Sequence, residues 1–286
     1  MLRRLAFAIL AALSLAACGQ PQPARPALWE VTGPRGEHGW LFGTIHTLAR
    51  EAEWRSADVS RALDRADVLV LEIAGIDDED QMRAVFEGLA HSPGLPPLDQ
   101  RVGPELRPVL VKLLADNRID PAQLAETETW AAALMLSGLD NKDADPGNGI
   151  DRAIVAAMPS LPRAELEGTQ SQLSIFDRLP EADQRVMLES ALRKDPREAT
   201  GDQLSAAWRK GDLDTIARET RTGMMADPVI RKALFSDRNL AWAGRIEAML
   251  RAGKRPFVAV GTAHLAGSDG LPAMLAARGW KVVRLQ

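Results

Sequence analysis

The sequence predicts an α/β (α+β) fold: a central mixed sheet built from both ends of the chain, with a large helical lobe inserted at about residues 78–252. Two patterns predict it. Short apolar runs bounded by Gly and Pro gather near the two ends, as in strands. The middle instead has apolar residues at helical spacing, interrupted by Pro and Gly. Because neither end could bury its strands alone, we expect both to join one sheet.

The predicted strands and helices follow in order along the chain. Near the start, 28–31 and 40–45 predict a hairpin around a turn at 33–36, followed by a helix at 56–65 and a buried strand at 67–73. Near the end, 256–260, 271–278 and 281–285 predict a βαβ unit. Between them we expect one weak strand at 163–166 and helices at 79–91, 104–116, 121–137, 149–158, 170–178, 181–193, 202–210, 212–225 and 228–252.

Length and composition exclude several classes of protein. With 286 residues and 46% hydrophobic content, the chain can bury a large core as one globular domain, at 28–286. Its formal net charge is −4. Such an acidic chain is a poor nucleic-acid binder, so we expect no nucleic-acid partner.

The first residues predict export and a lipid anchor. A signal peptide at 1–17 has basic Arg3 and Arg4, then an apolar run too short for a bilayer, which needs about 20 residues. It ends in the lipobox Leu15-Ala16-Ala17-Cys18, and Cys18 is the only cysteine. Lipidation of Cys18 would anchor the protein to a membrane, with 18–27 as a Pro-rich tether. The alternative is an ordinary secretory signal with an incidental cysteine.

The same residues predict the location. Gly19 follows the cysteine, and by resemblance to sorting patterns this favours the outer membrane over inner-membrane retention. We therefore expect an exported lipoprotein that faces the periplasm. Its oligomeric state is left open.

Two near-identical segments carry the chemistry. Phe42-Gly43-Thr44-Ile45-His46 and Val260-Gly261-Thr262-Ala263-His264 each end a predicted strand with Gly-Thr-X-His. Loops at the carboxyl edge of a sheet are where such folds place ligands, so the two histidines are predicted to meet. The other two histidines, His38 in a turn and His91 beside Ser92, are expected to be solvated loop residues.

A carboxylate is the third component. Glu72 interrupts the apolar strand near its carboxyl end, where burial without a partner would cost several kcal/mol. A cation is therefore expected beside it. A divalent metal held by His46, Glu72 and His264 would satisfy this carboxylate. The alternative is an arginine partner, or exposure at the strand end.

These motifs resemble the TraB/GumN family, which includes Tiki-type metalloproteases and is similar to erythromycin-esterase-like and ChaN-like proteins. The resemblance covers nearly all of the mature chain, and Gly261 to Gly267 is its most diagnostic run. It implies an active site built from both GxxH histidines and acidic residues. Glu167 is a candidate second acid or general base, and Arg238 a candidate substrate anchor or oxyanion stabiliser. Asp151 is expected to cap a helix or lie in a loop.

The leading functional prediction is a metal-dependent hydrolase of peptide, amide or ester bonds, using zinc, manganese or cobalt to activate water. A second possibility needs no metal: one histidine acts as general base and Glu72 orients it. The non-enzymatic alternative is an envelope or polysaccharide-assembly factor that binds a ligand in the same cleft. The substrate, whether peptide, ester or glycan, stays open because the shape of the helical lobe would determine it.

Overall fold

The computed structural model describes residues 21–140, 144–193 and 198–286. The predicted signal peptide and Cys18 lie outside these residues, so the anchor stays a prediction. Within the described ranges, no helix combines the length and the apolar character needed to cross a bilayer.

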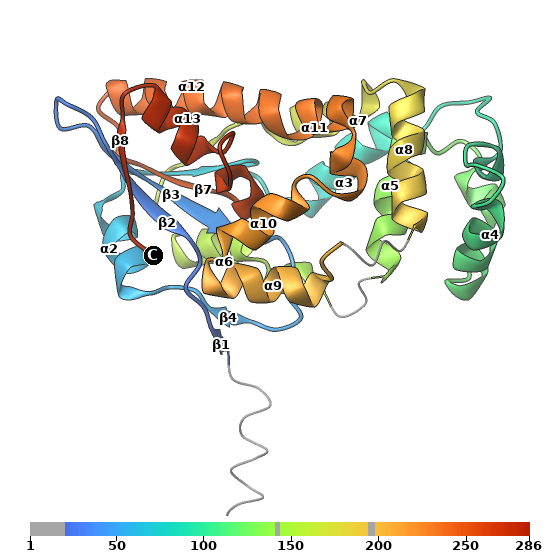
Figure 1. The fold of residues 1–286 in the computed structure, drawn as a ribbon, viewed down its shortest axis with the longest axis horizontal. Helices are drawn as coiled ribbons and strands as arrows, with labels where there is room; N and C mark the ends of the chain where they lie inside the picture. The colour runs from blue at the N-terminus through green and yellow to red at the C-terminus, as the bar shows by residue number, and fades with distance from the viewer. Residues whose placement is uncertain (1–20, 141–143, 194–197) are drawn as a thin grey trace, which may run out of the picture.

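A six-stranded mixed sheet forms the centre of the molecule (Figure 1). Its order is β6 (Arg163–Glu165), β5 (Val68–Leu71), β7 (Pro256–Gly261), β3 (His38–Thr44), β2 (Leu28–Thr32) and β8 (Lys281–Arg284). The first four are parallel neighbours, whereas β2 runs antiparallel to both β3 and β8. The prediction of a mixed sheet from both chain ends is confirmed, with β6 as the contribution of the middle.

The predicted βαβ unit is present in an expanded form. Helix α13 (Leu271–Ala277) connects β7 to β8, which run in the same direction because β8 and β3 are both antiparallel to β2. Strands β3 and β2 lie between them in the sheet. The N-terminal hairpin is therefore inserted into the C-terminal unit, which joins the two chain ends.

The helices match the predicted helical segments. They are α2 (Ala57–Arg65), α3 (Glu79–Leu89), α4 (Arg107–Asp116), α5 (Thr129–Ser137), α6 (Ile150–Ala157), α7 (Thr169–Asp177), α8 (Glu181–Leu192), α9 (Gly201–Lys210), α10 (Leu213–Glu219), α11 (Pro228–Arg231) and α12 (Asp237–Arg251). One difference matters for the site. The helix expected at 228–252 contains a π-helical turn at Lys232–Ser236, between α11 and α12.

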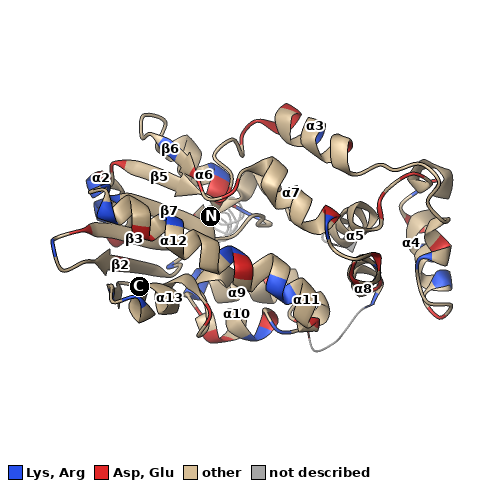
Figure 2. Cartoon of the chain, turned by 90° about the horizontal axis from the view of Figure 1, so that it is seen from above, with Lys and Arg blue, Asp and Glu red and all other residues tan. Residues whose placement is uncertain are grey.

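Both faces of the sheet are covered, as the alternation of side chains along each strand requires. In β3, Trp40 and Phe42 pack with residues of α2, α6 and α9, whereas Leu41 packs on the opposite face with α12 and α13. A separate apolar core joins α4, α5, α8 and α11 in the lobe seen at the right of Figure 2. The expected inserted lobe is thus only part of the insertion, because α6, α9 and α12 cover the sheet.

Most of the described part of the expected tether contacts the folded body. Gln22–Pro23 forms β1, which pairs in parallel with β4 (Ala52–Glu53). The backbone N–H of Arg25 donates to the carbonyl of Arg209 at 2.7 Å, and Ala27 is buried. From Gln22 onward the chain is therefore attached to the folded body, because its backbone groups pair there.

Candidate active site

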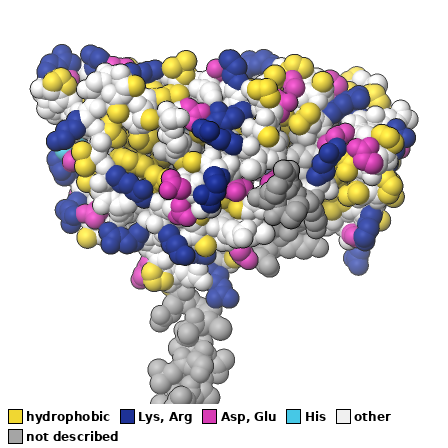
Figure 3. Space-filling model, in the orientation of Figure 1, with side chains coloured by type: hydrophobic (Ala, Val, Ile, Leu, Met, Phe, Trp, Pro, Cys, Tyr) yellow, Lys and Arg dark blue, Asp and Glu magenta, His cyan; other side chains and the backbone are white. Residues whose placement is uncertain are grey.

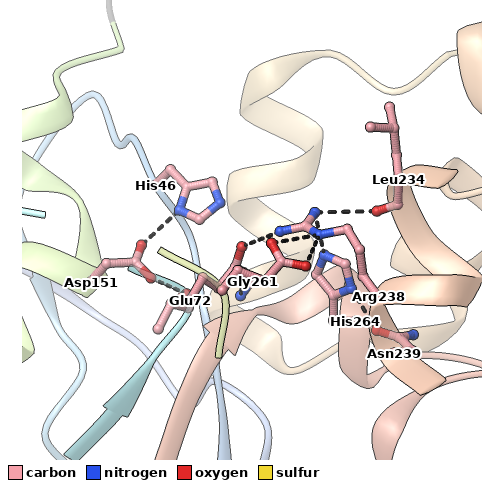
Figure 4. Close-up of polar contacts among 10 residues, drawn as sticks. His46, Glu72, Asp151, Leu234, Arg238, Asn239, Gly261 and His264 are labelled. Atoms are coloured by element: carbon pink, nitrogen blue, oxygen red, sulfur yellow. Dashed lines mark hydrogen bonds and ion pairs between the residues drawn. The ribbon is translucent and has the colours of Figure 1, made fainter. Parts of the chain in front are cut away.

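The carboxyl ends of the four parallel strands meet at one edge, and the structure brings all five predicted site residues together there (Figure 4). His46 lies two residues after β3, Glu72 one residue after β5, and Glu167 two residues after β6. His264 lies in the 3₁₀ turn after β7, and Arg238 lies in the first turn of α12.

Gly261 marks the point on which three of these side chains converge. A Cβ atom on this glycine would lie 3.4 Å from Oε1 of Glu72, 3.5 Å from Nε2 of His46 and 3.8 Å from Cδ2 of His264. The two GxxH segments, far apart in sequence, thus share one small space with the acid of β5. The absence of a side chain at position 261 keeps that space open.

His46 is held by a carboxylate that lies on α6. Its Nδ1 is 2.8 Å from Oδ2 of Asp151, whose Oδ1 accepts the hydroxyl hydrogen of Thr44 at 2.6 Å. The imidazole is 60% exposed, whereas Asp151 is buried. The charge of Asp151 and its hydrogen bond raise the pKa of His46 to about 9. At neutral pH the ring is therefore mainly an imidazolium, with Nε2 directed to the open side.

The expectation that Asp151 caps a helix or lies in a loop is wrong. Gly149 is the N-cap of α6, and Asp151 lies in the first turn with its side chain on Thr44 and His46. A Cβ at Gly149 would clash with the carbonyl oxygen of His46, so this glycine allows the close approach. The signal in the sequence was an acid on the apolar face of a helix, beside Ile150 and Ile154.

His264 differs from His46 in both burial and charge, although the five-residue segments that contain them match. It is buried, and its ring lies against Phe235 and Trp242, with centroids 5.2 and 4.5 Å away. Its Nδ1 is 2.6 Å from Oδ1 of Asn239, whose amide nitrogen donates to the carbonyl of Asp269. Because that oxygen can only accept, Nδ1 carries the hydrogen and Nε2 is the acceptor. Burial lowers the pKa of His264 to about 3, so the ring is neutral at pH 7.

Arg238 is the cation beside Glu72. Its Nη2 donates to Oε2 of Glu72 at 2.9 Å, and its Nε donates to both oxygens of Glu167 at 3.0 and 3.1 Å. Its Nη1 donates to the carbonyl of Leu234 and lies 3.4 Å from Nε2 of His264. The open alternative of an arginine partner for Glu72 is therefore what the structure contains. The pair is buried rather than a surface salt bridge.

The surroundings of Glu72 favour its charged form. Burial by itself would raise the pKa of this carboxyl. The positive charge of His264, which is present only when its ring is protonated at acidic pH, acts with the charges of His46 and Arg238 and with the N–H of Gly261 at 2.9 Å from Oε1. Together they outweigh burial and lower the pKa to about 2. Glu72 is therefore ionised at neutral pH, and each of its oxygens accepts one hydrogen bond.

The three expected metal ligands do not fit a divalent ion in this arrangement. Nε2 of His264 faces the guanidinium of Arg238, which also donates to Oε2 of Glu72. A dication placed among them would meet a fixed positive charge. Nor is any other group of three or more His, Cys, Asp or Glu arranged to hold a metal among the described residues.

Sequence reasoning missed several residues that fix the site. Asn239 follows Arg238 directly and sets the tautomer of His264. The π-helical turn before α12 provides the carbonyl of Leu234 and the ring of Phe235. Such turns occur often at functional sites, but their single extra residue leaves no clear mark on apolar periodicity.

The other predictions near the site have mixed outcomes. His38 is not a solvated turn residue: it begins β3, and its ring contacts Glu30 at 2.6 Å and lies against Trp40. His91 is exposed and contacts Glu87, as expected of a solvated residue. Four tryptophans are buried, namely Trp130, Trp208, Trp242 and Trp280.

Comparison with known proteins gives the family. The curated relatives include the uncharacterised YbaP proteins of Shigella flexneri and Escherichia coli (strain K12). Each is 25% identical to this chain over 257 residues, covering 87% of this chain and 92% of the relative. No solved structure matches. The TraB/PrgY/gumN family model matches residues 27–284, nearly the whole described body, and the chain therefore belongs to the TraB/PrgY/gumN family.

Proposed function

We propose that this protein hydrolyses ester or amide bonds with His46 as the acid–base group and without a bound metal. The observation that carries the proposal is the His46–Asp151 pair: one ring nitrogen is fixed by a buried carboxylate, and the other is free beside Glu72. A histidine oriented in this way is a common device for activating a nucleophile. Asp151 takes the orienting role that sequence reasoning gave to Glu72.

The reaction can be written on these side chains. A water near Gly261 would donate its hydrogens to Nε2 of neutral His46 and to Glu72. As the water oxygen bonds to the substrate carbonyl carbon, Nε2 takes its proton and the carbonyl electrons move to oxygen. The imidazolium then returns that proton to the leaving oxygen or nitrogen as its bond to carbon breaks. Arg238 acts here as a positioning residue, because its three nitrogens already hold Glu72, Glu167 and Leu234.

A screen of the purified full-length protein in detergent tests this proposal. Nitrophenyl esters and fluorogenic peptides would be assayed with the wild type, His46→Ala and His91→Ala. His91 is the matched control, because it is also an exposed histidine with a carboxylate contact. We expect turnover in the wild type and His91→Ala and its loss in His46→Ala. Equal turnover in His46→Ala and the wild type would refute the proposal.

We also propose that the enzyme acts on the envelope side of a membrane, anchored through Cys18. The support is the lipobox at residues 15–18, which precedes the family match that begins at residue 27. Labelled palmitate should be incorporated into the wild type and not into Cys18→Ser. Labelling of both variants, or of neither, would contradict the anchor.

A further inference from the structure

The exposed ring of His46 lines two cavities of different chemistry. One, of about 240 Å³, also contains Glu72 and Asp151 in its wall. The other, of about 680 Å³, extends from the His46 loop to the start of α9. Because His46 and Thr47 belong to both walls, a molecule lying across the imidazole would enter both cavities.

The smaller cavity has apolar side chains in its wall besides the site carboxylates. They include Leu71, Ile73, Ile76 and Met82, from the end of β5, the following loop and α3, together with Pro146. All except Leu71 are at least partly exposed. An acyl chain or apolar side chain entering here would cover them and gain the free energy of apolar burial.

The larger cavity offers positive charge. Arg50, from the loop after β3, and Arg209, from α9, both line it. Neither guanidinium forms an ion pair in the part of the chain that the structure describes, which differs from most arginines near the site, including Arg231 and Arg238. Asp202 is the one acid among the described residues of this wall.

Two arginines that line one cavity, with no ion pair among the described residues, are suited to a carboxylate or phosphate, since each guanidinium can donate two parallel hydrogen bonds. Basic and acidic side chains are interspersed over the face seen in Figure 3, so that face shows no uniformly basic surface. The selection of an anion would therefore come from side chains that line the same cavity, as Arg50 and Arg209 do.

We propose that the substrate joins an apolar group to an anionic group across the bond that His46 cleaves. The apolar group would occupy the cavity of Ile76 and Met82, and the anion would contact Arg50 and Arg209. This inference rests on the proposed function for the cleavage step alone. The two cavities and their chemistry are independent of it.

Matched substrates test the proposal on the full-length protein. N-octanoyl-glutamate is compared with N-octanoyl-glutamine amide, which has no carboxylate, and with N-acetyl-glutamate, which has no long acyl chain. We expect KM to be at least about tenfold lower for N-octanoyl-glutamate than for either analogue, because one lacks hydrogen bonds to a charged group and the other lacks apolar burial. The double variant Arg50→Gln/Arg209→Gln should remove the preference for glutamate over glutamine amide, and Ile76→Asp the preference for octanoyl over acetyl.

Two control variants lie on α4, in the lobe far from His46 (Figure 2). Arg107→Gln removes an exposed arginine, and Val111→Asp adds a charge to a valine that is 58% exposed. Both should keep the wild-type preferences. The proposed roles of the two cavities would be overturned if the cavity variants kept these substrate preferences, or if the wild type showed none.

Binding separates this proposal from the proposed function. Calorimetry would use the ketone analogues of the two octanoyl compounds, in which a methylene replaces the amide nitrogen. Glutamate-selective binding without turnover of any substrate would overturn the hydrolase and support the two-part site. Turnover without selectivity would overturn the site alone, and the loss of both would overturn both.

Discussion

Replacement of Arg238 by methionine should strongly destabilise the fold at neutral pH. Its guanidinium is the cation between Glu72 and Glu167, whose side chains are 8% and 12% exposed. Methionine keeps the apolar stem but leaves two carboxylates buried without their partner. Removing one partner of a buried ion pair costs about 3–5 kcal/mol. The matched control is Arg251→Met, on the same helix, where an exposed pair with Glu247 contributes about 0–1 kcal/mol.

Urea denaturation of the two variants at pH 7 measures the difference in the free energy of unfolding. A double variant that also neutralises one carboxylate provides a second test. Glu72→Gln/Arg238→Met removes one of the stranded charges, so it should be more stable than Arg238→Met alone. Such non-additivity is expected between groups in direct contact.

The pH dependence of the free energy of unfolding provides an independent test. In the wild type the pKa of Glu72 is lowered from 4.5 to about 2, so its contribution to stability is present above about pH 4.5 and is lost as the pH falls towards 2. Without Arg238 that pKa rises, and the stability deficit of Arg238→Met should shrink in the same pH range. A deficit below about 1 kcal/mol at pH 7 would refute the reasoning, because another cation or water would then have to stabilise Glu72.

Three further outcomes follow from the same geometry. If His46 is the base, kcat/KM should rise with pH up to about 9. Asp151→Asn should move this rise in kcat/KM to lower pH, because it removes the charge that raises the pKa of His46. An unchanged pH profile would show that Asp151 does not act on the catalytic base. Gly261 has φ −49°, which alanine adopts freely, so Gly261→Ala should retain wild-type stability but lose turnover, because its methyl group fills the space between His46 and Glu72. Chelation, and titration with zinc, manganese or cobalt, should leave turnover unchanged; restoration by one metal would support the metal-dependent alternative.

Much of the fold was predictable because it depends on patterns within short segments. The apolar runs that became β3, β5 and β7 are covered on both faces, and their residues show this directly. The convergence of their ends followed from strand direction. In contrast, the order of the sheet required long-range pairing, and the insertion of β2 and β3 between β7 and β8 leaves no mark on either segment.

The composition of the site was predictable in part, for a similar reason. Glu72 showed that a cation had to be near, since a carboxylate in an apolar strand needs one. Its identity could not be read, because Arg238 comes from a helix that looks like any amphipathic segment. The predicted metal would meet the same electrostatic requirement that Arg238 meets in this arrangement of donors.

The two Gly-Thr-X-His segments show that local sequence does not determine the burial or the charge of a histidine. Both place a histidine at the same edge of the same sheet, yet one imidazole is exposed and cationic and the other is buried and neutral. The difference lies in the partner of Nδ1: a carboxylate from α6 for His46, and an amide oxygen from α12 for His264. Both partners come from the helical middle of the chain. The sheet ends therefore bring the two rings together, and the insertion decides which of them is protonated at neutral pH.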